Sequence, residues 1–355
     1  MAETELDMAR VEAFGERVLG FMNGAGTALF LSIGHRTGLF DTMSQMVPST
    51  SDQIATTTGL NERYVREWLD GLVVAGVVEY DPASVTYQLP QEHAALLSRA
   101  AGPDNFAFFA QYLALVGEVE GDVVDAFRTG GGVPYERYPR FQGLQRDESA
   151  RVYDASLVDA ILPLAPEVVD RLKTGTETAD VGTGGGHAVN VMARAFPNSR
   201  FTGFDISEEG LAMGRHEAEE WDLENVTFVR RDAGEIEGSF GLITTFDVIH
   251  DLAQPAAALD AISRSLAPDG IYLMGEIAAS SKVEENVDNP IGPLLYMFSV
   301  FYCMTTALSQ GGVGVGTAWG DQLCRRYLAD SGFTAVDAHA VEGDIFNVYY
   351  VCTKT

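Results

Sequence analysis

One short segment limits the folds open to this chain: an apolar run that passes through an acid into a glycine turn. It reads Ala179-Asp180-Val181-Gly182-Thr183-Gly184-Gly185-Gly186-His187, and residues 189–195 follow with helical spacing of apolar side chains. The apolar run predicts a buried parallel strand, and the glycines predict a sharp turn that can approach a ligand closely. Open α/β sheets bind ligands at the carboxyl ends of their strands. We therefore expect an α/β fold with a nucleotide-type site at this turn.

The spacing of the glycines and of later acids narrows the kind of nucleotide. The dinucleotide fingerprint has glycines spaced G-x-G-x-x-G, and His187 occupies the third of these positions. The spacing present is G-x-G-x-G, which speaks against a Rossmann dehydrogenase. Two further predicted strands, residues 199–205 and 226–232, also end in acids, Asp205 and Asp232. A carboxylate at Asp205 can accept hydrogen bonds from both hydroxyls of a ribose.

Together these segments resemble the class I S-adenosylmethionine (SAM) methyltransferases. The resemblance implies a Rossmann-like sheet, with Asp180 near the amino end of SAM and the glycines under its ribose and amino-acid part. It also implies that Asp232 lies beside the adenine amino group. Solvated acids at strand ends are the structural alternative. The cofactor-binding residues expected on this basis are Asp180, Gly182, Thr183, Gly184, Gly186, Asp205, Ile206, Asp232, Ala233 and Asp247.

A histidine follows the fourth predicted strand, residues 242–245, at the same edge of the sheet. It lies in the segment Phe246-Asp247-Val248-Ile249-His250-Asp251-Leu252. Methyl transfer to a phenol needs a proton acceptor, since the ordinary pKa of a phenol is about 10. Histidine titrates near neutral pH and suits this task. A carboxylate bound to one ring nitrogen would leave the other free, and Glu276, Asp251 and Asp247 are the candidates. A packed or capping histidine is the alternative.

Residues 248–251 resemble the His-Asp pair of the winged-helix small-molecule O-methyltransferases. In that family the histidine is the general base, so the resemblance implies His250 as base, Asp251 beside it and Glu276 as the flanking acid. The pattern departs at Leu252, where the family usually has Trp, and this departure concerns the acceptor pocket more than the cofactor site. Residues 296–310 and 343–350 also resemble actinobacterial-type SAM-dependent methyltransferases of unassigned substrate.

Residues 1–100 show the element order of a winged helix. Residues 28–43 have helical periodicity. A short helix capped by Ser51 runs to Thr57, a second helix covers 62–75, and a hairpin covers 77–89. The second helix, which would read DNA, carries two arginines among three acids, whereas a DNA reader should present a basic patch. Small-molecule O-methyltransferases often form dimers through such a module, so the resemblance implies a homodimer.

Residues 101–172 predict a helical connector, and residues 173–355 the SAM-binding domain. In the connector, Phe106, Phe108, Phe109 and Tyr112 either pack in a core or line a pocket for an apolar or aromatic substrate. The later domain predicts a turn over 267–270, a fifth strand over 271–277 and a last hairpin over 335–340 and 347–352. Residues 293–308, followed by glycines at 311–316, predict a pocket lid or dimer surface with a hinge, or a buried helix with an exit loop.

The charge of the chain disfavours anionic partners. A net charge of −28 repels phosphate backbones and anionic membranes. Solubility or adaptation to high salt accounts for most of this charge. Nucleic acid is therefore not expected as a partner, and a small-molecule methyl acceptor is.

Cysteine usage and hydropathy predict a cytoplasmic protein without a membrane span. Cys303, Cys324 and Cys352 are widely spaced with no C-x-x-C, which argues against a disulfide framework and against a zinc site. The N-terminus is acidic and unlike a signal peptide. The most apolar run, residues 291–308, contains Gly292 and Pro293 and is expected to be too interrupted to span a bilayer.

The sequence thus predicts a homodimeric, SAM-dependent methyltransferase that acts on a hydroxyl of a small, partly apolar or aromatic molecule. Two alternatives stay open: methylation of nitrogen or carbon, and a winged-helix regulator that binds SAM without catalysis. A nucleic-acid amino methyltransferase would carry an Asn/Asp-Pro-Pro-Tyr/Phe motif after the fourth strand. This chain has Phe246-Asp247-Val248-Ile249 there, which argues against that class.

Overall fold

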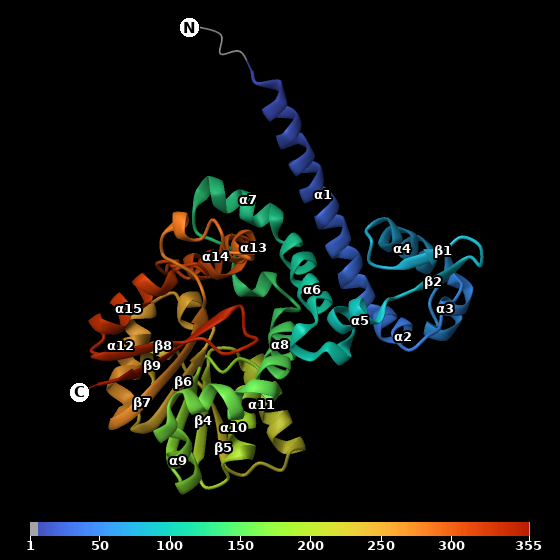
Figure 1. The fold of residues 1–355 in the computed structure, drawn as a ribbon. Helices are drawn as coiled ribbons and strands as arrows, with labels where there is room; N and C mark the ends of the chain where they lie inside the picture. The colour runs from blue at the N-terminus through green and yellow to red at the C-terminus, as the bar shows by residue number, and fades with distance from the viewer. Residues whose placement is uncertain (1–5, 355) are drawn as a thin grey trace. The chain divides into compact units, whose positions relative to one another are not determined.

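The computed structural model describes residues 6–354, and the chain divides into two compact units, Met1–Gly117 and Glu118–Thr355. The first unit is mainly helical with a small hairpin, and the second is built on a seven-stranded sheet. Figure 1 shows the elements of both units. The predicted connector is divided between them, since residues 101–117 belong to the first unit.

The first unit has the winged-helix order that the sequence predicted. In chain order its elements are α1 (Met8–Thr37), α2 (Leu39–Met43), α3 (Ser51–Thr58), α4 (Glu62–Val74), β1 (Glu79–Asp81), β2 (Thr86–Gln88), α5 (Gln91–Leu97), the 3₁₀ turn η1 (Arg99–Asp104) and α6 (Phe106–Gly117). The amphipathic helix α4 buries Val65, Trp68, Leu69 and Leu72 in the core of this unit, because these side chains recur at helical spacing.

Two boundaries in this unit differ from the prediction. The cap of α3 is Thr50 and not Ser51: the Thr50 hydroxyl accepts from the Gln53 backbone N–H, and the Gln53 side chain accepts from the Thr50 N–H. The helix expected from residue 28 onward begins much earlier, at Met8, and is broken at Gly38. Gly38 has φ 72°, a left-handed conformation that ends α1.

The second unit is a sheet covered by helices on both faces (Figure 1). Its helices are α7 (Glu120–Thr129), α8 (Phe141–Ser156), α9 (Pro166–Thr174), α10 (His187–Ala195), α11 (Glu208–Glu220), α12 (Pro255–Ser265), α13 (Gly292–Phe298), α14 (Met304–Ser309) and α15 (Gly320–Asp330). Its strands are β3 (Glu177–Val181), β4 (Arg200–Asp205), β5 (Val226–Arg230), β6 (Phe240–Phe246), β7 (Leu266–Ile277), β8 (Ala335–His339) and β9 (Asn347–Thr353).

The strand order is β5-β4-β3-β6-β7-β9-β8, and β3 lies between β4 and β6. Strands β3 to β7 pair in parallel, while β9 is antiparallel to both β7 and β8. The predicted reversed hairpin at the end of the chain is thus present. Side chains alternate between the faces of β7. Tyr272 and Met274 pack in the cluster that contains α12 and α15, and Ile271 and Leu273 pack in the cluster that contains α9 and α10.

Two predicted strand boundaries in this unit are wrong: the end of the third strand and the start of the fifth. Strand β5 ends at Arg230, and Asp232 instead accepts a hydrogen bond from the Gly234 N–H at the start of a 3₁₀ turn. The predicted turn over residues 267–270 lies within β7. There the pairing jumps from Phe240–Leu266 to Leu242–Ile271, so the extra residues bulge out of the ladder without ending the strand.

The apolar run near residue 300 is one continuous helical stretch, Gly292–Ser309, and the prediction that it is interrupted is wrong. Pro293 lies in the first turn, where its missing N–H has no helical partner to lose. A wide π-helical turn, η8 (Ser299–Cys303), joins α13 to α14. By length and composition alone this stretch could cross a membrane, but 39% of it is buried within the second unit.

Candidate active site

A cavity of about 830 Å³ opens at the carboxyl ends of β3, β4 and β6, and its lining residues all belong to the second unit. Its size is typical of sites for small molecules, which range over about 300–1,000 Å³. The position is the one at which open α/β sheets bind their ligands. Most of the residues predicted to bind the cofactor line this cavity.

The glycine loop after β3 forms one wall of the cavity. Gly182 and Gly184 have φ of 72° and 53°, which only glycine adopts readily. A Cβ on Gly182 would lie 2.4 Å from the Val248 side chain, so the loop also needs glycine for close packing. The Gly182 N–H donates to the Phe204 carbonyl at the end of β4, which ties the loop to the next strand.

Asp205, at the end of β4, holds the glycine loop and faces the cavity. Its Oδ2 accepts from the Gly184 N–H at 2.8 Å, and its Oδ1 accepts from the Ser207 N–H at 2.7 Å. Burial raises the pKa of this carboxyl, and the backbone N–H groups offset part of the rise. Each carboxylate oxygen can accept a further hydrogen bond, so both are available to a ligand in the cavity.

Asp180 is a buried acid one strand away. Its two oxygens accept from the hydroxyls of Thr183 at 2.6 Å and Thr244 at 2.7 Å. Burial raises the pKa of Asp180 to about 6, although the two hydroxyl donors oppose the rise. Its role as a cofactor residue stays a prediction, and its position on the cavity wall agrees with it.

The other predicted cofactor residues divide into those on the cavity wall and one behind it. Thr183, Ile206, Asp232, Ala233 and Asp247 line the cavity, as Asp180, Gly182, Gly184 and Asp205 do. Gly186 does not. It caps α10 at φ 75°, where a Cβ would lie 2.6 Å from the Phe228 ring, so its role is to let α10 begin against β5.

The predicted flanking acid holds His250 in place. His250 lies in the 3₁₀ turn η6 (Ile249–Asp251) after β6, and Glu276 lies on the neighbouring strand β7. The Glu276 Oε2 is 2.7 Å from His250 Nδ1 and accepts from the Trp319 Nε1–H at 3.0 Å. Its Oε1 accepts from the Ile249 N–H at 2.9 Å. These donors fix the carboxylate, and the carboxylate fixes the imidazole ring.

The second nitrogen of His250 is not free, contrary to the expectation for a simple base. Nε2 lies 3.3 Å from Asp251 Oδ1, and both acids face the ring. Burial alone lowers the pKa of His250, but the charges of Glu276 and Asp251 hold it well above its usual value. Among the described residues that line the cavity, Asp251 is present and His250 is not.

Aromatic side chains form the other wall of the cavity. The ring of Phe141 stacks on that of Tyr302 at 3.6 Å, with 19° between their planes. The predicted wall residues Phe106, Phe108, Phe109 and Tyr112 lie instead in α6 of the first unit, where Phe108 and Tyr112 are buried. Sequence reasoning missed the actual wall, which comprises Tyr135, Tyr138, Phe141, Tyr153, Phe246 and Tyr302.

His187 is neither at the surface nor on the cavity wall. It is buried, with Nδ1 3.0 Å from Glu217 Oε1 and Nε2 3.2 Å from Asp154 Oδ1. Glu217 also accepts from the Arg146 guanidinium at 3.1 Å. This network joins α8, α10 and α11 behind the glycine loop.

Comparisons with known proteins agree with this architecture. Residues 25–99 match the model of the Rv2258c-like winged HTH domain, and residues 172–294 match that of a methyltransferase domain. The chain is 30% identical over 113 residues to the ubiquinone biosynthesis O-methyltransferase of Psychrobacter arcticus. That match covers 30% of this chain and 43% of the relative, so the chain spans less than half of that protein.

Solved structures resemble the chain over nearly its whole length. Human N-acetylserotonin methyltransferase in complex with SAM covers 100% of both chains with a TM-score of 0.69 and 17% identity. An O-methyltransferase family protein from Burkholderia thailandensis covers 96% of this chain and 97% of its own, with a TM-score of 0.68 and 14% identity. At such identities the likeness shows a shared fold.

The fold and the two domain matches define a class I methyltransferase of the winged-helix type, as the sequence predicted. Residues 172–294 are its methyltransferase domain, and residues 25–99 are its winged-helix domain.

Proposed function

We propose that this protein is a SAM-dependent methyltransferase that methylates a hydroxyl of a small aromatic or partly apolar molecule. One observation carries the proposal: a single cavity is lined both by the glycine loop with its acids and by Asp251, the outermost member of the Glu276–His250–Asp251 chain. The Psychrobacter relative is named an O-methyltransferase, and the human structural neighbour holds SAM.

The residues of the glycine loop fit SAM. Gly182 and Gly184 leave room for the ribose and amino-acid part, since no Cβ intervenes. The oxygens of Asp205 have lone pairs left for the two ribose hydroxyls. Asp232, in the turn after β5, is exposed and lines the same cavity, where its carboxylate suits the adenine amino group. Bound SAM supplies an already activated methyl group, so the protein mainly has to position the acceptor and remove its proton.

We assign proton removal to Asp251 with His250 behind it. Asp251 lines the cavity, and burial raises the pKa of its carboxyl, which makes it a stronger base than an exposed carboxylate. His250, oriented by Glu276, holds Asp251 and stabilises its charge. The aromatic wall around Phe141 and Tyr302 suits a planar acceptor, which would stack on these rings.

Calorimetric titration of the full chain tests the class. We expect micromolar binding of SAM and of S-adenosylhomocysteine, and no binding of NAD, because the glycine spacing suits an adenosyl ligand and lacks the dinucleotide pattern. Binding of NAD without either adenosyl ligand would contradict the proposal.

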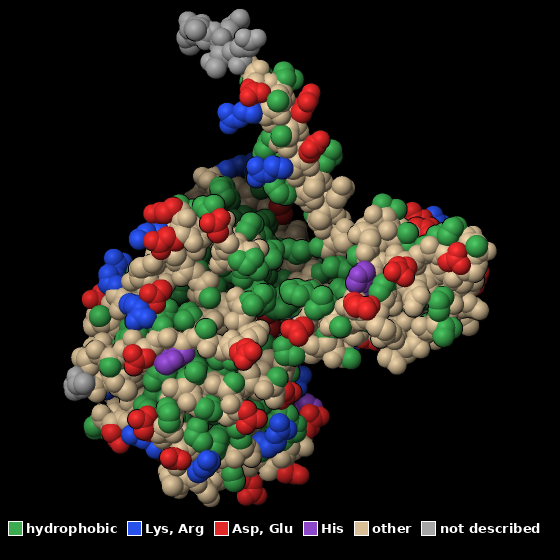
Figure 2. Space-filling view, viewed as in Figure 1, with side chains coloured by type: hydrophobic (Ala, Val, Ile, Leu, Met, Phe, Trp, Pro, Cys, Tyr) green, Lys and Arg blue, Asp and Glu red, His purple; other side chains and the backbone are tan. Residues whose placement is uncertain are grey.

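We further propose that α1 joins two copies of the chain. Residues 8–26 of this helix are exposed, and apolar side chains stand out along it (Figure 2). An isolated helix of this kind gains little from propensity alone, so its stability calls for a packed partner. A second copy, with the same apolar helix, is the occupant we infer. The exposed apolar residues of α1 are Met8, Val11, Phe14, Val18, Leu19, Phe21, Met22, Leu29 and Ile33.

Light scattering after size-exclusion chromatography tests this dimer. The wild-type chain is expected to elute as a dimer, and the double variant Phe14→Glu/Leu19→Glu as a monomer, because two charges would have to be buried in the contact. The control variant Glu12→Gln, on the same helix, should stay dimeric. A monomeric wild-type chain at micromolar concentration would refute the dimer.

The ion pairs of α4 support the proposal that the winged helix does not read DNA. Both arginines of α4 are already paired with acids of the same helix, Arg63 with Glu67 and Arg66 with Glu62. These ion pairs leave no basic patch on α4, which supports a dimer module over a regulator.

The three cysteines are free and buried, which suits a reducing cytoplasm.

A further inference from the structure

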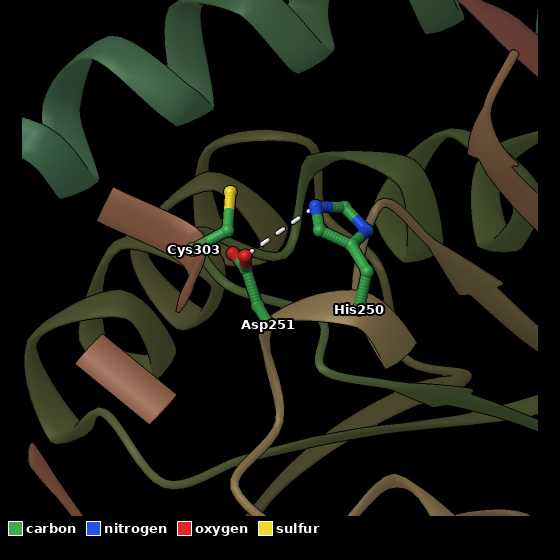
Figure 3. Close-up of side chains that lie close together, drawn as sticks. All are labelled: His250, Asp251 and Cys303. Atoms are coloured by element: carbon green, nitrogen blue, oxygen red, sulfur yellow. Dashed lines mark ion pairs between the residues drawn. The ribbon is translucent and has the colours of Figure 1, made fainter. Parts of the chain in front are cut away.

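Three side chains of different chemistry converge beside the cavity. His250 and Asp251 come from η6, and Cys303 comes from the last residue of the π-helical turn η8. One ligand atom of each, an imidazole nitrogen, a carboxylate oxygen and the sulfur, lies within 4.8 Å of the other two. Figure 3 shows the three side chains pointing toward one another. Cys303 is far from His250 and Asp251 in the sequence, so the sequence alone did not indicate this cluster. No metal site was predicted.

The donor set is the one that zinc prefers. Zinc binds imidazole nitrogen, thiolate sulfur and carboxylate oxygen together, usually in tetrahedral geometry. Magnesium and calcium take oxygen ligands, so a cysteine in the cluster disfavours them. Three protein ligands leave a fourth tetrahedral position for solvent.

Neighbouring side chains engage two of the three proposed ligands, His250 and Cys303. Glu276 engages His250 at Nδ1, which directs Nε2 toward Asp251 and Cys303. In many zinc sites a carboxylate accepts a hydrogen bond from the outer nitrogen of the ligating histidine and so orients its ring. The Thr317 hydroxyl donates to the Cys303 sulfur at 2.9 Å and would stabilise a thiolate there.

Asp251 offers a buried acceptor to an ion at this cluster. Its Oδ1 is fully buried and, within the described part of the chain, makes no well-aligned hydrogen bond; His250 Nε2 lies 3.3 Å from it as an ion-pair partner. Buried polar atoms are nearly always satisfied by a hydrogen bond, water or an ion. This oxygen lies on the side of Asp251 that faces His250, where an ion held by the three side chains would sit.

We propose that His250 Nε2, a carboxylate oxygen of Asp251 and Cys303 Sγ bind one zinc ion beside the cavity. The ion would occupy both groups that remove the acceptor's proton, so zinc inhibits methyl transfer. This consequence rests on the proposed function, whereas the binding site itself does not.

Cobalt titration of the metal-free full chain tests the site, because cobalt(II) replaces zinc and is coloured. One equivalent should produce a thiolate-to-cobalt charge-transfer band and the strong visible bands of four-coordinate cobalt, and zinc should abolish both. Cys303→Ser should lose the charge-transfer band, while Cys352→Ser, the same change at another buried cysteine, should keep it. A wild-type chain without the band, or a band that survives in Cys303→Ser, would overturn the site.

A second variant guards against misfolding. Asp251→Asn keeps the cysteine and should retain the charge-transfer band with weaker cobalt affinity, and thermal unfolding shows whether each variant is folded. Zinc should also lower wild-type turnover at the concentration at which it binds. If the cobalt band depends on Cys303 but zinc leaves turnover unchanged, the zinc site stands and the proton-acceptor assignment of the proposed function fails.

Discussion

Replacing Asp251 by Asn is expected to lower the turnover number for methyl transfer by about 10²–10⁴-fold, the range that general acid–base catalysis contributes. The amide is nearly the same size but cannot accept a proton. SAM affinity should be unchanged, because the acids that we assign to the cofactor, Asp180, Asp205 and Asp232, lie on β3, on β4 and after β5, and none lies in η6. Steady-state kinetics with a phenolic acceptor and calorimetry with SAM measure the two effects separately.

His250→Ala should lower turnover at least about tenfold while SAM still binds, because the chain to Glu276 is broken. The control for Asp251→Asn is the same change at an exposed position, Asp269→Asn. The Asp269 side chain is 79% exposed, and this variant should leave turnover unchanged. Unchanged turnover in both Asp251→Asn and His250→Ala would rule out the proton-acceptor assignment. Loss of activity in His250→Ala alone would instead make the histidine itself the base.

Replacing Asp205 by Ala is expected to raise the SAM dissociation constant at least about 100-fold. Hydrogen bonds to a charged group contribute about 1.5–3 kcal/mol each, and about 1.4 kcal/mol corresponds to a tenfold change in affinity. Two ribose hydroxyls would lose their acceptor, and the N–H groups of Gly184 and Ser207 would lose theirs. Calorimetric titration gives the dissociation constant directly.

Two controls separate lost recognition from lost folding. Glu208→Ala, three residues away on α11, pairs with Arg215 at the surface and should bind SAM as the wild type does. Thermal unfolding of Asp205→Ala shows whether the loop still folds. A folded variant with a dissociation constant within about threefold of the wild type would show that Asp205 does not hold the ribose.

The sequence by itself determined the sheet and the edge at which its ligand site lies. Apolar runs ending in Asp180 and Asp205 predicted parallel strands, and the carboxyl ends of parallel strands meet at one edge. The acids therefore had to converge whatever the details of packing. The glycine pattern is equally local, because the positive φ values of Gly182 and Gly184 are a property of the backbone at those residues.

Only the tertiary structure determined which side chains surround the proposed proton-accepting residues. Local periodicity shows which face of an element is apolar, but not which residues of a distant element meet it. Cys303 of η8 lies beside Asp251 in the turn after β6, and Tyr302 of η8 stacks on Phe141 at the start of α8. The sequence placed Asp251 next to His250, but only the structure shows that its carboxylate turns toward the second ring nitrogen, because the direction of a side chain in a short turn depends on the packing around it.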